Sequence, residues 1–330
     1  MPTSEKQLLV TGAAGFIGGS LMHRLALRGL NVHGVDNYSE YYNPRIKRHH
    51  IEQLLLSSHI SDLDICNFES LSELYSKIRP DVVIHLAAQG GVRASENDPK
   101  PYIQTNQMGF YHLLQLNNTF NVQEFIYASS SSVYGEGLPV PFRENMSLPA
   151  PKSLYAVSKL ADELMSQNYP IGQNQKRIGL RFFTVYGPWG RPDMAVSKLL
   201  TSGFSNQEFT LTANSDLARD FTYVEDVTDV IEDLIMLDKQ DFAPHTIFNV
   251  AGESPRTMSE LIEICHNSGF TLNIRQGVIN KSDVAKTHGS SAKLSKFGLR
   301  IPRTSLERGI DFTIKWFSGK ENAEILNLLA

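Results

Sequence analysis

The chain has 330 residues, which suggests about two domains of ordinary size. Apolar residues make up 41% and charged residues 20%, as in soluble globular proteins. The net charge of -4, with no long block of one sign, argues against binding to nucleic acid or to a membrane surface. The two cysteines are far apart and lack metal-ligand spacing, so we expect no metal site and a reducing, cytoplasmic location.

Short apolar runs alternate with amphipathic segments along the first two thirds of the chain. Strands are expected at 8–11, 31–36, 81–88, 124–129, 177–183 and 245–252. Helices are expected at about 16–28, 45–56, 99–118 and 153–167. This β-α-β alternation predicts an α/β fold built on a Rossmann-type doubly wound parallel sheet.

The alternation loosens after Gly187, where turn-forming sequences accumulate. We therefore expect a nucleotide-binding domain at 1–187, to which the strand near 245–252 returns. Residues 188–330 are expected to form mostly a smaller, mixed α/β lobe that binds the substrate.

The sequence TGAAGFIGG lies between the first strand and the first helix and places glycines at Gly12, Gly15 and Gly18. Such glycines permit a tight turn and let the backbone approach a pyrophosphate at the helix N-terminus, where Phe16 and Ile17 begin the helix. The sequence therefore predicts a dinucleotide site.

The second strand ends in Asp36, followed by Asn37. A carboxylate at this place accepts hydrogen bonds from both ribose hydroxyls and repels a 2′-phosphate, which favours NAD over NADP. Asp64 and Ile65, in the sequence DLDIC, are expected to contact the adenine. The remaining residues expected to bind the cofactor lie at the end of the apolar run 81–88: Leu86, Ala87 and Ala88.

The sequence YAVSK places Tyr155 and Lys159 four residues apart on one predicted helix, so they share a face. A tyrosine hydroxyl becomes a base near neutral pH only if a nearby positive charge stabilises its anion. We predict that Tyr155 is the catalytic base and that Lys159 both stabilises its anion and binds the nicotinamide ribose.

Five motifs occur in one order: TGAAGFIGG, HLAAQGGVR, SSSSVYG, YAVSK and RDFTYVEDV. In this the chain resembles the extended short-chain dehydrogenase/reductases, the NAD-dependent epimerases and dehydratases of nucleotide sugars. The resemblance implies a UDP-sugar substrate and a bound NAD that is reduced and reoxidised within each turnover. It also implies a homodimer that pairs through the helices at 99–118 and 153–167.

The resemblance assigns the catalytic hydroxyl of the serine run to Ser130. The next two positions resemble an Asp-Glu pair in sugar dehydratases, and decarboxylases similarly carry a Glu. Here they are Ser131 and Ser132, which cannot act as carboxylic acids, although both can contact the sugar. Dehydration and decarboxylation are therefore disfavoured. The reaction that remains is a 4-epimerisation, in which the sugar is oxidised at carbon 4, the 4-keto sugar rotates and the hydride is returned.

The segment RFFTVYGPWGRPDMA resembles the signature of UDP-glucuronate 4-epimerases. By that resemblance Thr184 and Arg191 face the sugar carboxylate, a role that suits a hydroxyl and a planar guanidinium. Arg93 is expected near the sugar, and Arg219 is expected to bind the pyrophosphate unless it pairs with a neighbouring aspartate. Ser282 stands where many uronate epimerases have a Gly.

Two alternatives stay open: a UDP-glucose or UDP-N-acetylhexosamine 4-epimerase, and a non-enzymatic NAD-binding scaffold. The presence of Ser130, Tyr155 and Lys159 together argues against a scaffold.

Overall fold

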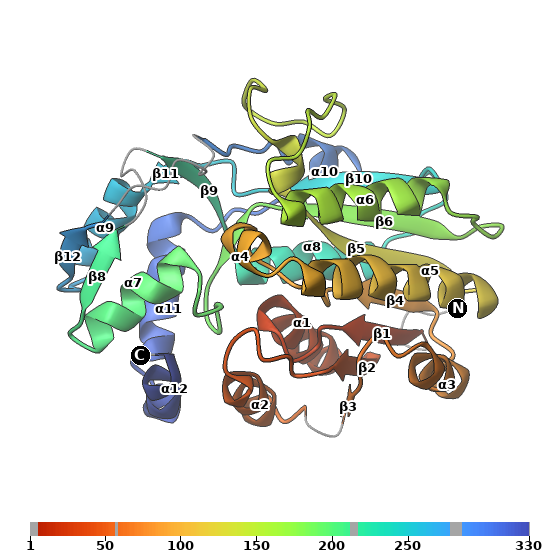
Figure 1. The fold of residues 1–330 in the computed structure, drawn as a ribbon, viewed down its shortest axis with the longest axis horizontal. Coiled ribbons are helices and arrows are strands. Elements are labelled where there is room, and N and C mark those ends of the chain that lie inside the picture. Colours follow the sequence, from red (N-terminus) through yellow and green to blue (C-terminus); the bar gives the residue numbers. More distant parts are fainter. Residues whose placement is uncertain (1–5, 57–58, 212–216, 278–285, 330) are drawn as a thin grey trace. The chain divides into compact units, whose positions relative to one another are not determined.

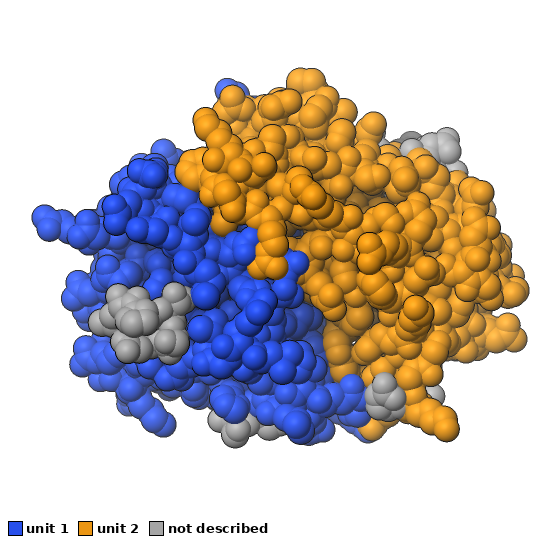
Figure 2. Space-filling view, turned by 180° about the vertical axis from the view of Figure 1, so that it is seen from behind, with its two compact units in different colours: residues 1–135, 147–182, 228–248 blue, residues 136–146, 183–227, 249–330 orange. Residues whose placement is uncertain are grey.

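A computed structural model of the chain describes residues 6–56, 59–211, 217–277 and 286–329. The chain divides into two compact units (Figure 2). Unit 1 comprises residues 1–135, 147–182 and 228–248, and unit 2 comprises residues 136–146, 183–227 and 249–330. The chain thus passes between the units more often than a boundary near Gly187 with one returning strand would require.

The main sheet has seven strands in the order β10-β6-β5-β4-β1-β2-β3 (Figure 1). Every pairing from β3 to β6 is parallel. The strands are β1 (Gln7–Thr11), β2 (Asn31–Asp36), β3 (Ile60–Asp62), β4 (Val82–His85), β5 (Glu124–Ser130), β6 (Lys176–Phe182) and β10 (His245–Val250). The order reverses between β1 and β4, which is the point at which doubly wound sheets bind ligands.

Helices pack on both faces of this sheet. On one face, α1 (Phe16–Leu27) lies against α8 (Val224–Met236), and Arg24 pairs with Asp229 and Glu232 of α8. On the other face, α3 (Phe68–Ile78), α5 (Phe110–Thr119) and α6 (Leu154–Asn168) pack together. Leu71, Phe110 and Phe125 belong to the buried core beneath them. Two further helices are α2 (Pro44–Gln53) and α4 (Val92–Asn97).

Two expected elements differ from the structure. The strand expected at 81–88 ends at His85, because Leu86 to Ala88 leave the sheet beside the glycine-rich turn. The helix expected at 99–118 begins as a π-helix, Tyr102–Gly109, before it continues as α5. The π-helix positions Asn106, whose amide bonds Gln89, and π-helical segments are frequent at functional sites.

Unit 2 contains two small sheets, ordered β11-β9-β7 and β12-β8. Their strands are β7 (Thr184–Tyr186), β8 (Glu208–Leu211), β9 (Ala218–Tyr223), β11 (Pro255–Thr257) and β12 (Asn273–Gln276). The helices are α7 (Ala195–Phe204), α9 (Met258–Asn267), α10 (Ala292–Lys296), α11 (Leu306–Phe317) and α12 (Ala323–Leu329). No helix in the described part of the chain is long and apolar enough to cross a membrane.

Candidate active site

The turn between β1 and α1 has the geometry that a dinucleotide requires. Gly12 adopts φ +70°, and a Cβ there would lie 2.6 Å from the amide nitrogen of Ala87. Helix α1 starts after Gly15, which offers no side-chain cap to the first turn. The amides of the first turn of α1 therefore donate to no side chain at the N-cap, and such amides suit a phosphate.

Asp36 is buried at the end of β2, and its carboxylate is held from two sides. Oδ2 accepts a hydrogen bond from the amide of Ala14 at 3.0 Å, and Oδ1 accepts one from the amide of Tyr38 at 2.8 Å. Lys47, on α2, lies with Nζ 3.8 Å from Oδ1. Lys47 could not be predicted here from the sequence, because only the fold brings α2 back to the end of β2.

The residues expected at the adenine also lie together. The side-chain amide of Asn37 donates to Asp64 at 2.9 Å, and the other oxygen of Asp64 accepts from the amide of Cys66. Ile65 is buried against Gly109 at the end of the π-helix. The turn, Asp36 and this pair thus form a row along the carboxyl ends of β1, β2 and β3.

Helix α6 carries Tyr155 and Lys159 and is fixed at its start by two serines. Ser153 caps the helix by accepting from the amide of Ala156, and Ser95 of α4 accepts from the amide of Tyr155. The ring of Tyr155 meets the ring of Tyr102 edge to face, with centroids 6.3 Å apart. Because α6 packs against β5 and the turn that follows it, the helix lies beside Ser130.

The serine run ends β5 and forms the 3-10 turn Ser131–Tyr134. Ser130 ends the strand, and its Oγ accepts hydrogen bonds from the amide and the hydroxyl of Ser132, at 3.2 and 3.0 Å. Ser129 points elsewhere: its hydroxyl donates to Glu163 at 2.5 Å, beneath the site. Ser129 therefore bonds the helix behind the strand, whereas Ser130 and Ser132 bond each other.

Sequence reasoning also missed a buried ion pair that joins α6 to β6. Arg181 donates to both oxygens of Glu163, at 2.9 and 2.7 Å, and to the hydroxyl of Tyr134 at 2.9 Å. Burial alone would lower the pKa of Arg181, but the bonds to Glu163 raise it above its ordinary value. The pair ties the helix of Tyr155 to the strand next to that of Ser130.

Lys159 is buried and pairs with Asp162 on the same helix, with Nζ 3.1 Å from Oδ2. His85 lies near it at the end of β4, where Nδ1 and the hydroxyl of Thr11 are 2.7 Å apart. Burial, and then the charge of Lys159, lower the pKa of His85 well below its ordinary value. His85 is thus a neutral core histidine, as its place in a buried strand predicts.

The residues expected to bind the substrate in unit 2 lie on β7, β9 and the loop after β7. Thr184 starts β7 and pairs with Phe221 of β9. The guanidinium of Arg191 donates to both carboxylate oxygens of Asp193, at 2.9 and 2.8 Å. Arg219 pairs through its backbone with Arg256 of β11.

Arg93 is exposed in α4 of unit 1. Ser282 lies outside the described residues.

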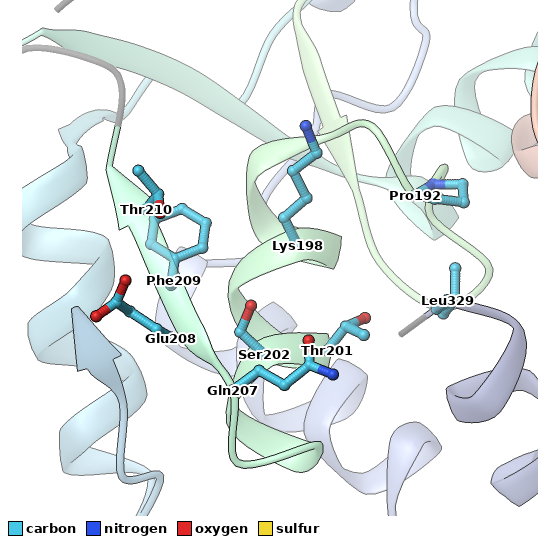
Figure 3. Close-up of a pocket in the computed structure, with 9 residues that line it drawn as sticks. All are labelled: Pro192, Lys198, Thr201, Ser202, Gln207, Glu208, Phe209, Thr210 and Leu329. Atoms are coloured by element: carbon cyan, nitrogen blue, oxygen red, sulfur yellow. The ribbon is translucent and has the colours of Figure 1, made fainter. Parts of the chain in front are cut away.

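Unit 2 also contains a cavity of about 250 Å³ between α7 and β8 (Figure 3). Lys198, Thr201 and Ser202 reach it from the helix. The hydroxyl of Thr201 is buried and has no hydrogen-bond partner among the described residues. The remaining lining residues are Pro192, Gln207, Glu208, Phe209, Thr210 and Leu329.

Comparisons with known proteins agree with this arrangement. The profile of the NAD dependent epimerase/dehydratase family matches residues 8–251. UDP-glucuronate 4-epimerase 4 of Arabidopsis thaliana is 37% identical over 330 residues, covering 94% of this chain and 75% of that protein.

Two solved structures are similar over nearly the whole chain. One is UDP-glucuronic acid 4-epimerase from Bacillus cereus with UDP-glucuronic acid and NAD, at TM-score 0.86 and 31% identity; it covers 94% of this chain and 99% of that chain. The other is UDP-glucose 4-epimerase from Thermus thermophilus with NAD, at TM-score 0.82 and 27% identity; it covers 95% of this chain and 99% of that chain. The expected fold class is confirmed.

Proposed function

Because the chain belongs to the NAD-dependent epimerase/dehydratase family, we propose that it interconverts UDP-glucuronate and UDP-galacturonate at carbon 4 of the sugar. Family membership and the similarity to UDP-sugar 4-epimerases confirm the prediction of an NAD-dependent nucleotide-sugar 4-epimerase. The choice of a uronate as the sugar goes beyond what family membership specifies. UDP-glucose and UDP-N-acetylhexosamines are the competing substrates. The similarity to a UDP-glucose 4-epimerase supports UDP-glucose as the main alternative.

The observation that carries the proposal is the serine run at the end of β5. Ser131 and Ser132 follow Ser130, and the hydroxyl of Ser132 donates to Ser130. Elimination of water from a sugar needs an acid and a base beside the carbon that is oxidised. Two hydroxyls supply neither, so the site favours a reaction that returns the sugar with all its groups in place.

In this proposal the residues of unit 1 move one proton. Tyr155 takes the proton of the sugar 4-hydroxyl, and Lys159 stabilises the phenolate. Ser130 bonds the same sugar oxygen; since it already accepts from Ser132, its own hydrogen is free to point to the substrate. When bound, NAD would supply the acceptor, and then the donor, of the hydride at carbon 4. Gly12, the first turn of α1 and Asp36 would hold it.

Preference for a uronate would come from unit 2. Arg191 already binds a carboxylate in a two-pronged arrangement, that of Asp193. The substrate carboxylate would take this place, with Thr184 as a second donor. Charge-assisted bonds of this kind contribute about 1.5–3 kcal/mol each. Arg219 would bind the pyrophosphate. The cavity at Thr201, whose lining combines hydroxyl and amide groups with charged and apolar side chains, would take the uracil.

Two further parts of the proposal concern assembly and location. Ile103, Met108 and Tyr111 on one helix and Val157 and Leu164 on α6 are exposed apolar side chains. They support a homodimer that pairs through these helices. Both cysteines are free thiols, which supports a reducing, cytoplasmic location.

The substrate is tested by incubating the purified protein with UDP-glucuronate, UDP-glucose and UDP-N-acetylglucosamine and separating the 4-epimers by chromatography. We expect UDP-galacturonate from the first, without added NAD, and far slower conversion of the others. Faster epimerisation of UDP-glucose would overturn the choice of the uronate.

The carboxylate role is tested with Arg191→Ala. The oxidised uronate is a β-keto acid that loses CO2 when its carboxylate is free to turn. We expect weaker binding of UDP-glucuronate and a larger share of decarboxylated product, with Arg308→Ala, an exposed arginine of α11, as control. Normal epimerisation without extra CO2 would show that Arg191 does not hold this group.

A further inference from the structure

Helix α6 carries a buried ion pair between Lys159, which the proposed mechanism uses, and Asp162, which it does not use. Lys159 is 2% exposed, and Asp162, one turn further on, is 0% exposed. Their charged groups are 3.1 Å apart. The second carboxylate oxygen of Asp162 accepts a hydrogen bond from the side-chain amide of Gln107, in the π-helix, at 3.2 Å. The carboxylate of Asp162 is thus bonded by one residue of the π-helix and one of α6, and one of its oxygens contacts the ammonium group of Lys159.

The other titratable groups near Lys159 and Asp162 either have ion-pair partners of their own or stay neutral near pH 7. Glu163, the next residue, forms its own pair with Arg181 of β6. Burial keeps the pKa of His85 on β4 well below, and that of Tyr127 on β5 well above, their ordinary values. Neither group changes charge near neutral pH, so Asp162 is the variable charge beside Lys159.

A carboxylate in this position weakens the effect that Lys159 has on its other neighbours. A cation lowers the pKa of a nearby phenol, and an anion beside the cation offsets that effect. We propose that Asp162 is a positioning residue that sets how much of the Lys159 charge reaches Tyr155, and so tunes the pH range in which the tyrosine acts as a base. The proposal rests on the role given to Tyr155 in the proposed function.

The titration of Asp162 supports the same conclusion. Burial raises its pKa to about 7, and the charge of Lys159 and the hydrogen bond from Gln107 oppose the rise. Below this pH Asp162 is neutral and Lys159 acts on Tyr155 with its full charge. Above it the carboxylate cancels part of that charge. In Asp162→Asn this side chain is neutral at every pH, so Lys159 would always act on Tyr155 with its full charge.

The test follows the ionisation of Tyr155 directly. The full chain is labelled with [13Cζ]tyrosine, and the Tyr155 resonance is assigned as the one that Tyr155→Phe removes. In Asp162→Asn we expect the Tyr155 titration to move down by about one pH unit, as for one charge removed within a few ångströms. The acid limb of kcat against pH should move by the same amount.

Asp98→Asn is the matched control, because it removes an exposed carboxylate from the end of α4, which packs on α6. It should leave the Tyr155 titration unchanged. If Asp162→Asn does not fold, Asp162→Ser removes the same charge and allows the same comparison. A Tyr155 titration that is unchanged, or that moves upward, in the Asp162 variant would overturn the proposal. Full epimerase activity in Tyr155→Phe would instead overturn the role of Tyr155 itself.

Discussion

The ion pair between Glu163 and Arg181 predicts a large and specific loss of stability. Arg181→Met removes two hydrogen bonds to Glu163 and one to Tyr134. It leaves a carboxylate that is 5% exposed, with the hydroxyl of Ser129 as a remaining partner. Breaking a buried pair on one side costs about 3–5 kcal/mol, because the other charge stays buried without compensation. We expect the free energy of unfolding to fall by this amount.

The double variant Arg181→Met/Glu163→Gln shows whether the loss comes from the orphaned charge. Removing both charges leaves no unpaired ion at this site, so the double variant should be more stable than Arg181→Met alone. Far-UV circular dichroism under urea is the suitable assay. Tryptophan fluorescence would miss unit 1, because Trp189 and Trp316, the two tryptophans of the chain, both lie in unit 2. A double variant as unstable as the single one would refute this reasoning.

Three further predictions concern the cofactor turn, pH and assembly. Gly12→Ala forces a Cβ against the Ala87 backbone, so this variant should purify without NAD. Gly29→Ala, also at positive φ but in open space, should retain NAD, and mass analysis of the denatured proteins measures the NAD released by each. Burial raises the pKa of Asp220 to about 7, so its stabilising contribution is full below about pH 4 and is lost as the pH rises through 7. Asp220→Asn should flatten the pH dependence of Tm in that window, and an unchanged slope would contradict it. By light scattering the wild type should be a dimer, and Val157→Glu, on the exposed face of α6, should be a monomer. A monomeric wild type would contradict the proposed homodimer.

Much of unit 1 could be predicted from the sequence, because its signals are local. The apolar runs at 8–11 and 81–88 are nearly continuous, as expected for strands buried on both faces, and parallel pairing places the ends of these strands at the same edge of the sheet. The turn at Gly12 and the pair Tyr155 and Lys159 follow from spacing along a single element. Asn37 and Asp64, both predicted at the cofactor, lie together, since the amide of Asn37 donates to the carboxylate of Asp64.

The residues that sequence reasoning missed depend on contacts distant in the chain. Lys47 meets Asp36 only after α2 folds back, and Arg181 meets Glu163 across two elements. Asp162 is one turn from Lys159, yet a charged residue on a helix gives no sign of whether it is buried. The π-helix has the same apolar spacing as an ordinary helix start, and its effect on Asn106 appears only in the structure.

The central claim is that the sugar is oxidised and reduced again at carbon 4 within one site. It is tested most directly with UDP-glucuronate that carries deuterium at carbon 4, followed by NMR in ordinary water. We predict UDP-galacturonate that keeps its deuterium at carbon 4, with no product from Tyr155→Phe. Product in which hydrogen from water has replaced the deuterium, or conversion at another carbon, would contradict the account.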